Sequence, residues 1–235
     1  IIRKLENKKF EIPVGISIGK TNSKSLNTQE ESIEDIVQAF GKFEKSKVKL
    51  QYYELNISCP NLHGSVEFYS VKNLKQLLTA IDKLKLTKPL FVKMPIDKSE
   101  KETLEMLKEI SLHKVTGVIF GNLQKDRTNS SFDKNEIESV KNLKGNFSGK
   151  PTYDQSNNLI KLAYKNYRKQ LVIIGCGGVF SAENAYEKIK NGATLVQMIT
   201  GMIFRGPQTI MEINLGLDEL MRKDGYTHIS QVIGK

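Results

Sequence analysis

Residues 52–61 read Tyr52-Tyr53-Glu54-Leu55-Asn56-Ile57-Ser58-Cys59-Pro60-Asn61. The stretch begins with aromatic and apolar side chains and ends in polar residues around a proline, which predicts a buried strand that runs into a loop. In parallel α/β folds, ligands bind at the carboxyl ends of the strands. Asn56, Cys59 and Asn61 would lie there, where two amides and a thiol can serve a planar polar ligand. The same pattern also fits a strand followed by an Asn/Pro turn with a buried structural cysteine.

The composition of the 235-residue chain is ordinary for a globular protein, with 26% charged and 39% hydrophobic residues. Its formal net charge of +10 comes from scattered lysines, without an arginine-rich run or a repeated aromatic pattern. We therefore expect no nucleic-acid partner, although the charge favours an anionic ligand. The two cysteines, Cys59 and Cys176, are far apart, and the three histidines share no metal-ligand spacing. This pattern indicates a reducing, cytoplasmic setting and no metal site.

Apolar runs and helical repeats alternate along the whole chain. The six expected strands begin near Ile12, Tyr52, Leu90, Gly117, Leu171 and Thr194. Helical spacing separates them, with Ser70, Ser99 and Ser181 as expected N-caps, and a long polar connection over 124–153 shows no clear periodicity. Continuously apolar strands that alternate with helices predict a parallel sheet covered by helices. Because no linker or repeat interrupts this order, we expect one domain over residues 1–235.

Polar residues and glycines recur where the expected strands end. They are Ser17, Asn56, Cys59, Asn61, Lys93, Asn122, Gly177, Gly178 and Thr200. A lysine on a buried strand is costly without a partner, so Lys93 either faces an anion or electron-rich ring or extends its ammonium to the rim of the fold. The turn at 175–178 resembles a phosphate-binding turn, in which backbone N–H groups hold an anion. Together with Ile199 and Thr200 it matches the phosphate site that (β/α)8 barrels build from their last loops.

Five motifs, taken together and in this order, resemble those of the dihydroorotate dehydrogenase family. They are Asn-Ile-Ser-Cys-Pro-Asn (56–61), Val-Lys-Met-Pro (92–95), Phe-Ser-Gly-Lys-Pro (147–151), Ile-Ile-Gly-Cys-Gly-Gly-Val (173–179) and Leu-Val-Gln-Met-Ile-Thr-Gly-Met-Ile-Phe-Arg-Gly-Pro (195–207). The third and fifth resemble the quinone-using class 2 enzymes, whereas Cys59 matches the base of the cytosolic class 1 enzymes. The resemblance implies an α/β fold, a (β/α)8 TIM barrel. We expect this chain to supply its C-terminal six β/α units and to lack the first two strands.

The resemblance also implies an activity and a cofactor. The family oxidises dihydroorotate to orotate with FMN in de novo pyrimidine (UMP) biosynthesis, and Cys59 would take the C5 proton while hydride passes from C6 to FMN. The positions that match substrate contacts are Asn56, Asn61, Asn122 and Leu123. The positions that match FMN contacts are Ser17, Asn56, Lys93, Gly121, Gly149, Gly178, Ile199 and Thr200.

The electron acceptor and two alternative functions stay open. The acceptor is a quinone or a soluble molecule, and membrane contact is expected only if a segment before Ile1 supplies it. We expect a cytoplasmic protein, with a peripheral position on the inner face of the membrane as the alternative. The altered residues 121–123 would also fit an FMN dehydrogenase of a related pyrimidine. The missing strands would fit a noncatalytic, truncated barrel that binds flavin or a pyrimidine.

Overall fold

The computed structural model describes residues 1–58 and 66–235 and contains all six expected strands. The strands are β1 (Gly15–Ile18), β2 (Tyr52–Asn56), β3 (Leu90–Lys93), β4 (Gly117–Phe120), β5 (Val172–Cys176) and β6 (Leu195–Gln197). The α-helices are α1 (Ile2–Leu5), α2 (Gln29–Glu44), α3 (Val71–Asp82), α4 (Glu100–Ile110), α5 (Lys134–Ser139), α6 (Tyr153–Tyr167), α7 (Ala182–Lys190), α8 (Thr200–Arg205) and α9 (Thr209–Lys223). Two short 3₁₀ helices are η1 (Lys150–Thr152) and η2 (Ile229–Gln231).

The chain divides into two compact units, one of residues 1–93 with 101–117 and one of residues 94–100 with 118–235. The single domain expected over residues 1–235 stays a prediction. One expected boundary was wrong, because β1 begins at Gly15 and not near Ile12. Ile12 is 72% exposed and Pro13 has no N–H to donate to a strand ladder, so the chain reaches the sheet only after them. In the part of the chain that the structure describes, no helix is both long and apolar enough to cross a bilayer.

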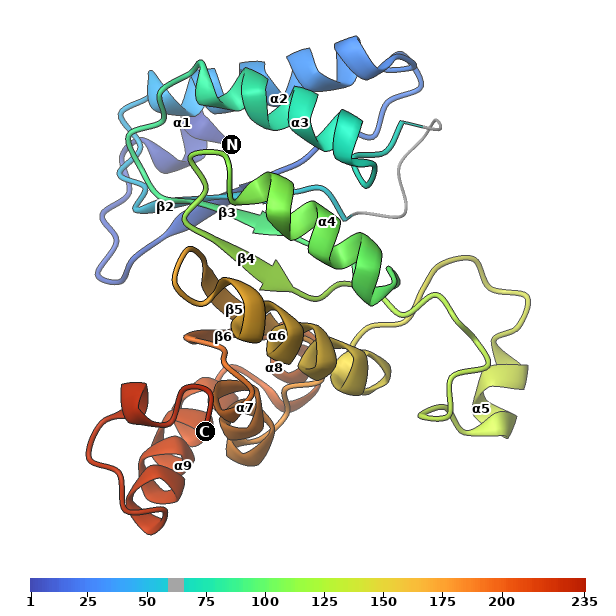
Figure 1. The fold of residues 1–235 in the computed structure, drawn as a ribbon, viewed down its shortest axis with the longest axis vertical. Helices are drawn as coiled ribbons and strands as arrows, with labels where there is room; N and C mark the ends of the chain where they lie inside the picture. Colours follow the sequence, from blue (N-terminus) through green and yellow to red (C-terminus); the bar gives the residue numbers. More distant parts are fainter. Residues whose placement is uncertain (59–65) are drawn as a thin grey trace. The chain divides into compact units, whose positions relative to one another are not determined.

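In the first unit, β1, β2 and β3 are neighbours in chain order and pair in parallel. The helices α2 and α3 pack against each other in this unit (Figure 1). Tyr53 of β2 meets Phe40 of α2 edge-on, with 5.4 Å between ring centroids, so this side of β2 faces the helix. Side chains alternate along a strand, and Glu54 and Asn56 therefore lie on the opposite face of β2.

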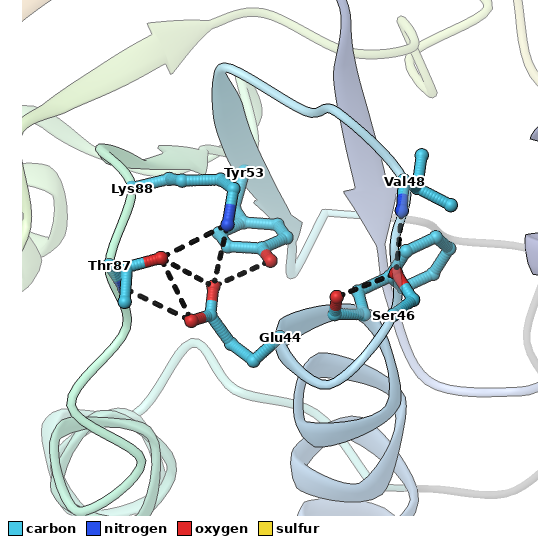
Figure 2. A network of polar contacts seen from close by, with 7 residues as sticks. Glu44, Ser46, Val48, Tyr53, Thr87 and Lys88 are labelled. Atoms are coloured by element: carbon cyan, nitrogen blue, oxygen red, sulfur yellow. Dashed lines mark hydrogen bonds and ion pairs between the residues drawn. The ribbon is translucent and has the colours of Figure 1, made fainter. Parts of the chain in front are cut away.

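A polar network closes the amino-terminal end of β2 and β3 (Figure 2). The Glu44 carboxylate accepts a hydrogen bond from the Tyr53 hydroxyl at 2.6 Å and one from the Thr87 hydroxyl at 2.9 Å, and it pairs with the Lys88 ammonium at 3.3 Å. Burial opposes ionisation of Glu44, but the hydrogen bonds from Tyr53 and Thr87 and the Lys88 charge outweigh it and lower the pKa of Glu44. In barrel folds this end of the strands contributes to stability, and catalysis occurs at the other end.

In the second unit, β4, β5 and β6 follow one another in chain order, and β5 and β6 pair in parallel. The helix α6 packs on β5, and α7 packs on both β6 and α9 (Figure 1). Buried apolar side chains of α7 and α9, among them Ala185, Ile189 and Ile213, form part of the core here. This packing holds the loops that follow β5 and β6 next to one another.

The long polar connection after β4 is ordered by local bonds and extends away from the strands of the second unit (Figure 1). Asp133 caps the short helix α5, and its carboxylate accepts from the N–H groups of Asn135 and Glu136. Arg127 donates to the carbonyls of Val140 at 2.9 Å and Leu143 at 2.7 Å. The connection expected to lack periodicity therefore folds through caps and side-chain bonds to the backbone.

Candidate functional site

The first unit brings three predicted residues to the carboxyl ends of neighbouring strands. Asn56 of β2 is directly opposite Lys93 of β3 in the parallel register. Ser17 of β1 is opposite Glu54, and its hydroxyl donates to the Glu54 carboxylate at 2.7 Å. Because Glu54 and Asn56 are two residues apart on one strand, Ser17, Asn56 and Lys93 share one face of the sheet. Glu54 also lies on this face, only 7% exposed, and was not predicted as a site residue.

The Asn56 side chain is fixed by the turn that follows β2. Its carbonyl oxygen Oδ1 accepts from both the backbone N–H and the hydroxyl of Ser58, each at 3.1 Å. Such a turn orients the amide and leaves Nδ2 as the group that carries its hydrogen-bond donors. The backbone of Gly19 lies close to the backbone of Asn56. A side chain at residue 19 would be crowded, because its Cβ would lie 2.9 Å from the backbone carbonyl oxygen of Asn56.

Lys93 presents a half-buried cation at the end of β3. In the described residues, no hydrogen bond or ion pair engages its ammonium. An ammonium in this position favours an anion or an electron-rich ring beside it. The contact of Lys93 with a ligand and the extension of its ammonium to the rim both stay predictions.

In the second unit, the residues after β4 lie beside the Ser148-Gly149 loop. Gln124 and Phe147 exchange two backbone hydrogen bonds of 2.7 Å and 3.0 Å as an isolated antiparallel bridge. The predicted residues Gly121, Asn122 and Leu123 come just before this bridge, and the Ser148-Gly149 loop comes just after it. Gly121 lies so close to Ile96 that a Cβ would be 2.1 Å from its Cγ2. No side chain fits at residue 121 without rearrangement.

The loops after β5 and β6 meet the same segment through glycines. Gly149 and Gly178 have positive φ angles of +81° and +71°, which residues other than glycine rarely adopt. A Cβ on Gly149 would be 2.9 Å from Cγ2 of Thr200, and one on Gly178 would be 2.6 Å from Cβ of Tyr153. The Thr200 hydroxyl donates to the Ser148 hydroxyl at 3.0 Å. We call the segments 148–153, 177–179 and 199–201, which include η1 and the starts of α6 and α8, the phosphate cradle.

The donor set of the phosphate cradle fits a phosphate group. Glycines with positive φ expose successive backbone N–H groups, and such concave arrangements bind anions. The hydroxyls of Ser148 and Thr200 add further donors. The second unit thus brings Gly149 next to Thr200 and Gly178 next to Tyr153, with Ile199 preceding Thr200, and their role as FMN contacts stays a prediction. Ser148 was missed, although it lies in one of the quoted motifs.

A buried lysine lies beneath the cradle and was also missed. Lys188 of α7 is fully buried, and its ammonium donates to Oγ of Ser156 at 3.0 Å and to Oδ1 of Asn157 at 2.8 Å. It also lies 4.9 Å from the ring centroid of Tyr153. Burial lowers the pKa of Lys188 to about 8, because the charged form loses its hydration.

Two predicted residues, Cys59 and Asn61, lie outside the described residues 1–58 and 66–235. Their proposed roles stay predictions. Cys176 is buried at the end of β5 as a free thiol. In the described part of the chain, no three His, Cys, Asp or Glu side chains are grouped closely enough to hold a metal ion.

Comparison with known proteins identifies close similarity to one family. The sequence model of the dihydroorotate dehydrogenase family matches residues 1–221. The quinone-dependent dihydroorotate dehydrogenase of Rippkaea orientalis is 32% identical over 226 residues, which cover 95% of this chain and 58% of that protein. The corresponding enzyme of a Sulfurovum species is 33% identical over 225 residues, 96% of this chain and 59% of the relative. The chain thus spans somewhat more than half the length of these relatives.

Solved structures show the same fold. Ligand-free DHODH from Eimeria tenella superposes with a TM-score of 0.82 at 23% identity, covering 99% of this chain and 68% of that structure. Its complex with ferulenol gives a TM-score of 0.80 at 22% identity, covering 94% and 61%. The expected fold class is confirmed: six parallel β/α units of a (β/α)8 barrel.

Proposed function

The chain belongs to the dihydroorotate dehydrogenase family, and from this premise we propose that it acts in the FMN-dependent oxidation of dihydroorotate to orotate. This reaction belongs to pyrimidine biosynthesis. The observation that carries the proposal is the phosphate cradle, where Gly149, Gly178 and Thr200 meet at the loops predicted to hold FMN. FMN, when bound, supplies the hydride acceptor of the reaction.

The residues at the strand ends support the assignment. Because Ser58 occupies Oδ1 of Asn56, the amide would offer its Nδ2 donors to an oxygen of a planar ligand such as dihydroorotate. Lys93, directly opposite, would place a positive charge beside the flavin and favour its reduced, anionic form. Asn122 and Leu123 would add substrate contacts from the loop after β4, and Asn61 would add another. Ser17 and Gly121 would complete the flavin contacts.

We assign Cys59 as the base that removes the C5 proton of dihydroorotate. Only the thiolate can accept that proton, and an ordinary cysteine thiol has a pKa of ~8.5. The rate of substrate oxidation should therefore rise with pH as the thiolate forms. The proton moves from C5 to Sγ of Cys59, and the hydride leaves C6, so that the C5–C6 double bond of orotate forms.

Turnover by variants of Cys59 tests this assignment. We expect Cys59→Ala to lower the rate of orotate formation by at least ~100-fold, since proton transfer by a positioned base contributes about 10²–10⁴. Cys59→Ser should keep a small activity that increases at high pH, because a hydroxyl is a much weaker acid than a thiol. Orotate formation by Cys59→Ala at the wild-type rate would exclude Cys59 as the base. Flavin that stays oxidised in the wild type would favour the noncatalytic alternative.

The same assay identifies the electron acceptor. The relatives named above are quinone-dependent, so we propose a quinone as the acceptor. Orotate formation should then be faster with a short-chain quinone analogue than with a water-soluble dye. The reverse preference would assign a soluble acceptor, the alternative that the cysteine at residue 59 favours.

A further inference from the structure

Lys188 carries a buried charge that has no carboxylate partner. Its side chain is fully buried, and its three N–H donors meet Ser156 Oγ, Asn157 Oδ1 and the face of the Tyr153 ring. In the described residues, no carboxylate lies within ion-pair distance of its ammonium. Buried charges are normally paired with an opposite charge, because neutral groups replace only part of the lost hydration. An internal ion pair therefore does not explain how the buried charge of Lys188 is compensated.

The ammonium of Lys188 is connected to the phosphate cradle by direct contacts. The hydroxyl of Ser156 accepts a hydrogen bond from Lys188 and donates one to the carbonyl oxygen of Cys176 at 2.7 Å. Cys176 is the residue immediately before the Gly177-Gly178 turn. Tyr153, whose ring covers the ammonium, lies against Gly178 so closely that a Cβ there would be 2.6 Å from Cβ of Tyr153. The ammonium of Lys188 is thus linked through Ser156 to Cys176, which directly precedes the turn that forms part of the cradle.

The ionisable groups around Lys188 leave its charge uncompensated. Asp154, Glu187 and Cys176 favour the charged lysine only from a distance, and burial outweighs them. The Glu187 carboxylate is engaged by the Tyr153 hydroxyl at 2.8 Å and by the Asn157 amide at 3.2 Å. Tyr153 itself is neutral, and burial together with the bond to Glu187 raises its pKa. An anion in the cradle would supply the missing negative charge.

We propose that Lys188 is a positioning residue for the phosphate cradle: its buried ammonium holds Tyr153, Ser156 and Asn157 beneath the Gly177-Gly178 turn and is the counter-charge of a bound phosphate. The inference rests on the proposed function, in which the ligand is the phosphate of FMN. Binding and protonation are reciprocal, so a phosphate that binds the charged form must also favour that form.

This reciprocity predicts a pH dependence of FMN affinity. The pKa of Lys188 is about 8 without ligand, and a bound phosphate raises it. Affinity is therefore highest below pH ~8 and falls as Lys188 loses its proton above this value. A phosphate ester has its second pKa near ~6, so the ligand itself does not titrate between about pH 7 and 9. One group with a pKa of about 8 lowers the affinity about tenfold over that interval, or about 1.4 kcal/mol.

The test compares FMN with riboflavin, which has the same ring and no phosphate. Dissociation constants are measured by flavin fluorescence on the flavin-free full-length protein at about pH 7 and 9. We expect the wild type to lose about tenfold in FMN affinity over this range and less than about twofold in riboflavin affinity. Lys188→Met should weaken FMN binding about 100-fold at pH 7, since a tenfold loss over the pH range requires a preference of that size for the charged form, and it should remove the pH dependence and leave riboflavin binding unchanged. Lys188→Arg, which keeps its charge, should bind FMN with no pH dependence.

Lys190→Met is the matched control, because Lys190 lies on the same helix with its side chain 44% exposed. It should behave as the wild type. A pH dependence that persists in Lys188→Met would assign it to another group and overturn the inference. A flat wild-type profile would overturn it even if Lys188→Met failed to fold. If the wild type binds neither flavin, the proposed function is overturned as well.

Discussion

At the scale of single residues, Glu44 and Lys188 show how the partners of a charged group oppose the cost of burial in one case and fail to do so in the other. Glu44 receives hydrogen bonds from Tyr53 and Thr87 and the positive charge of Lys88, so it stays ionised. In the described part of the chain, Lys188 contacts only neutral oxygen atoms and a ring, so burial lowers its pKa to about 8. Both the partners and the depth of burial differ, because Glu44 is partly exposed and has a cationic partner, whereas Lys188 is fully buried.

Replacing Glu44 by Gln should lower the free energy of unfolding by about 1–3 kcal/mol at neutral pH, because the donors from Tyr53, Thr87 and Lys88 lose a charged acceptor. Since folding lowers the pKa of Glu44, its contribution is complete above the unfolded value of ~4.3 and is lost as the pH falls below it. Urea unfolding of wild type and Glu44→Gln at neutral and acidic pH measures both effects.

Glu34→Gln on the same helix is the control, because Glu34 is exposed and, among the residues that the structure describes, accepts a bond only from Gln38, at 3.2 Å. Its free energy of unfolding should stay within about 0.5 kcal/mol of the wild type. An equal loss in both variants, or a Glu44→Gln effect that does not shrink in acid, would contradict the role given to the network in Figure 2.

Composition predicted the wrong environment for one lysine, Lys188. Scattered lysines predict solvated helical faces, and Lys190 fits this expectation. Lys188 does not, because it lies three residues after Ala185 and next to Ile189, both buried on the apolar face of α7. Helical spacing could have identified it. Ser148 gave no such signal, because its partner Thr200 lies 52 residues away.

At the scale of elements, helix caps were predictable where the cap directly precedes an apolar repeat. Ser70 and Ser181 each accept from the backbone N–H three residues later, as expected. The capping box of α2 was missed, because Thr28 precedes a polar first turn and the apolar repeat begins only at Ile33. The structure of the connection that contains α5 could not be predicted either. It depends on hydrogen bonds from Arg127 to carbonyls more than ten residues away, and such bonds leave no periodic pattern in the sequence.

Removal of the Thr28 cap should destabilise α2. The Thr28 hydroxyl accepts from the Glu31 N–H at 3.1 Å, and the Glu31 carboxylate accepts from the Thr28 N–H at 2.9 Å. These backbone bonds lower the pKa of Glu31. We expect Thr28→Ala to cost about 1 kcal/mol in the free energy of unfolding, and Thr28→Ser to cost a few tenths at most. Equal stability of Thr28→Ala and wild type in urea unfolding would show that the box contributes nothing.

At the scale of the whole molecule, alternation of strands and helices was enough to predict a parallel α/β fold with all six strands. Placement of the site followed from a general property of such folds, since ligands bind at the carboxyl ends of the strands. Spacing alone could not identify the ligand or the roles of individual residues, which came from the family resemblance. The register that places Asn56 opposite Lys93 was not predictable, because it depends on pairing between strands 37 residues apart.

The central claim, that the protein oxidises dihydroorotate with a bound flavin, is tested most directly by a single turnover without oxygen. Purified full-length protein is mixed anaerobically with dihydroorotate while the absorbance of its flavin is followed. We predict that the flavin bleaches, that one orotate forms per flavin, and that the rate rises with pH as a thiolate forms. A protein that contains no flavin, or whose flavin stays oxidised in excess dihydroorotate, would contradict the account.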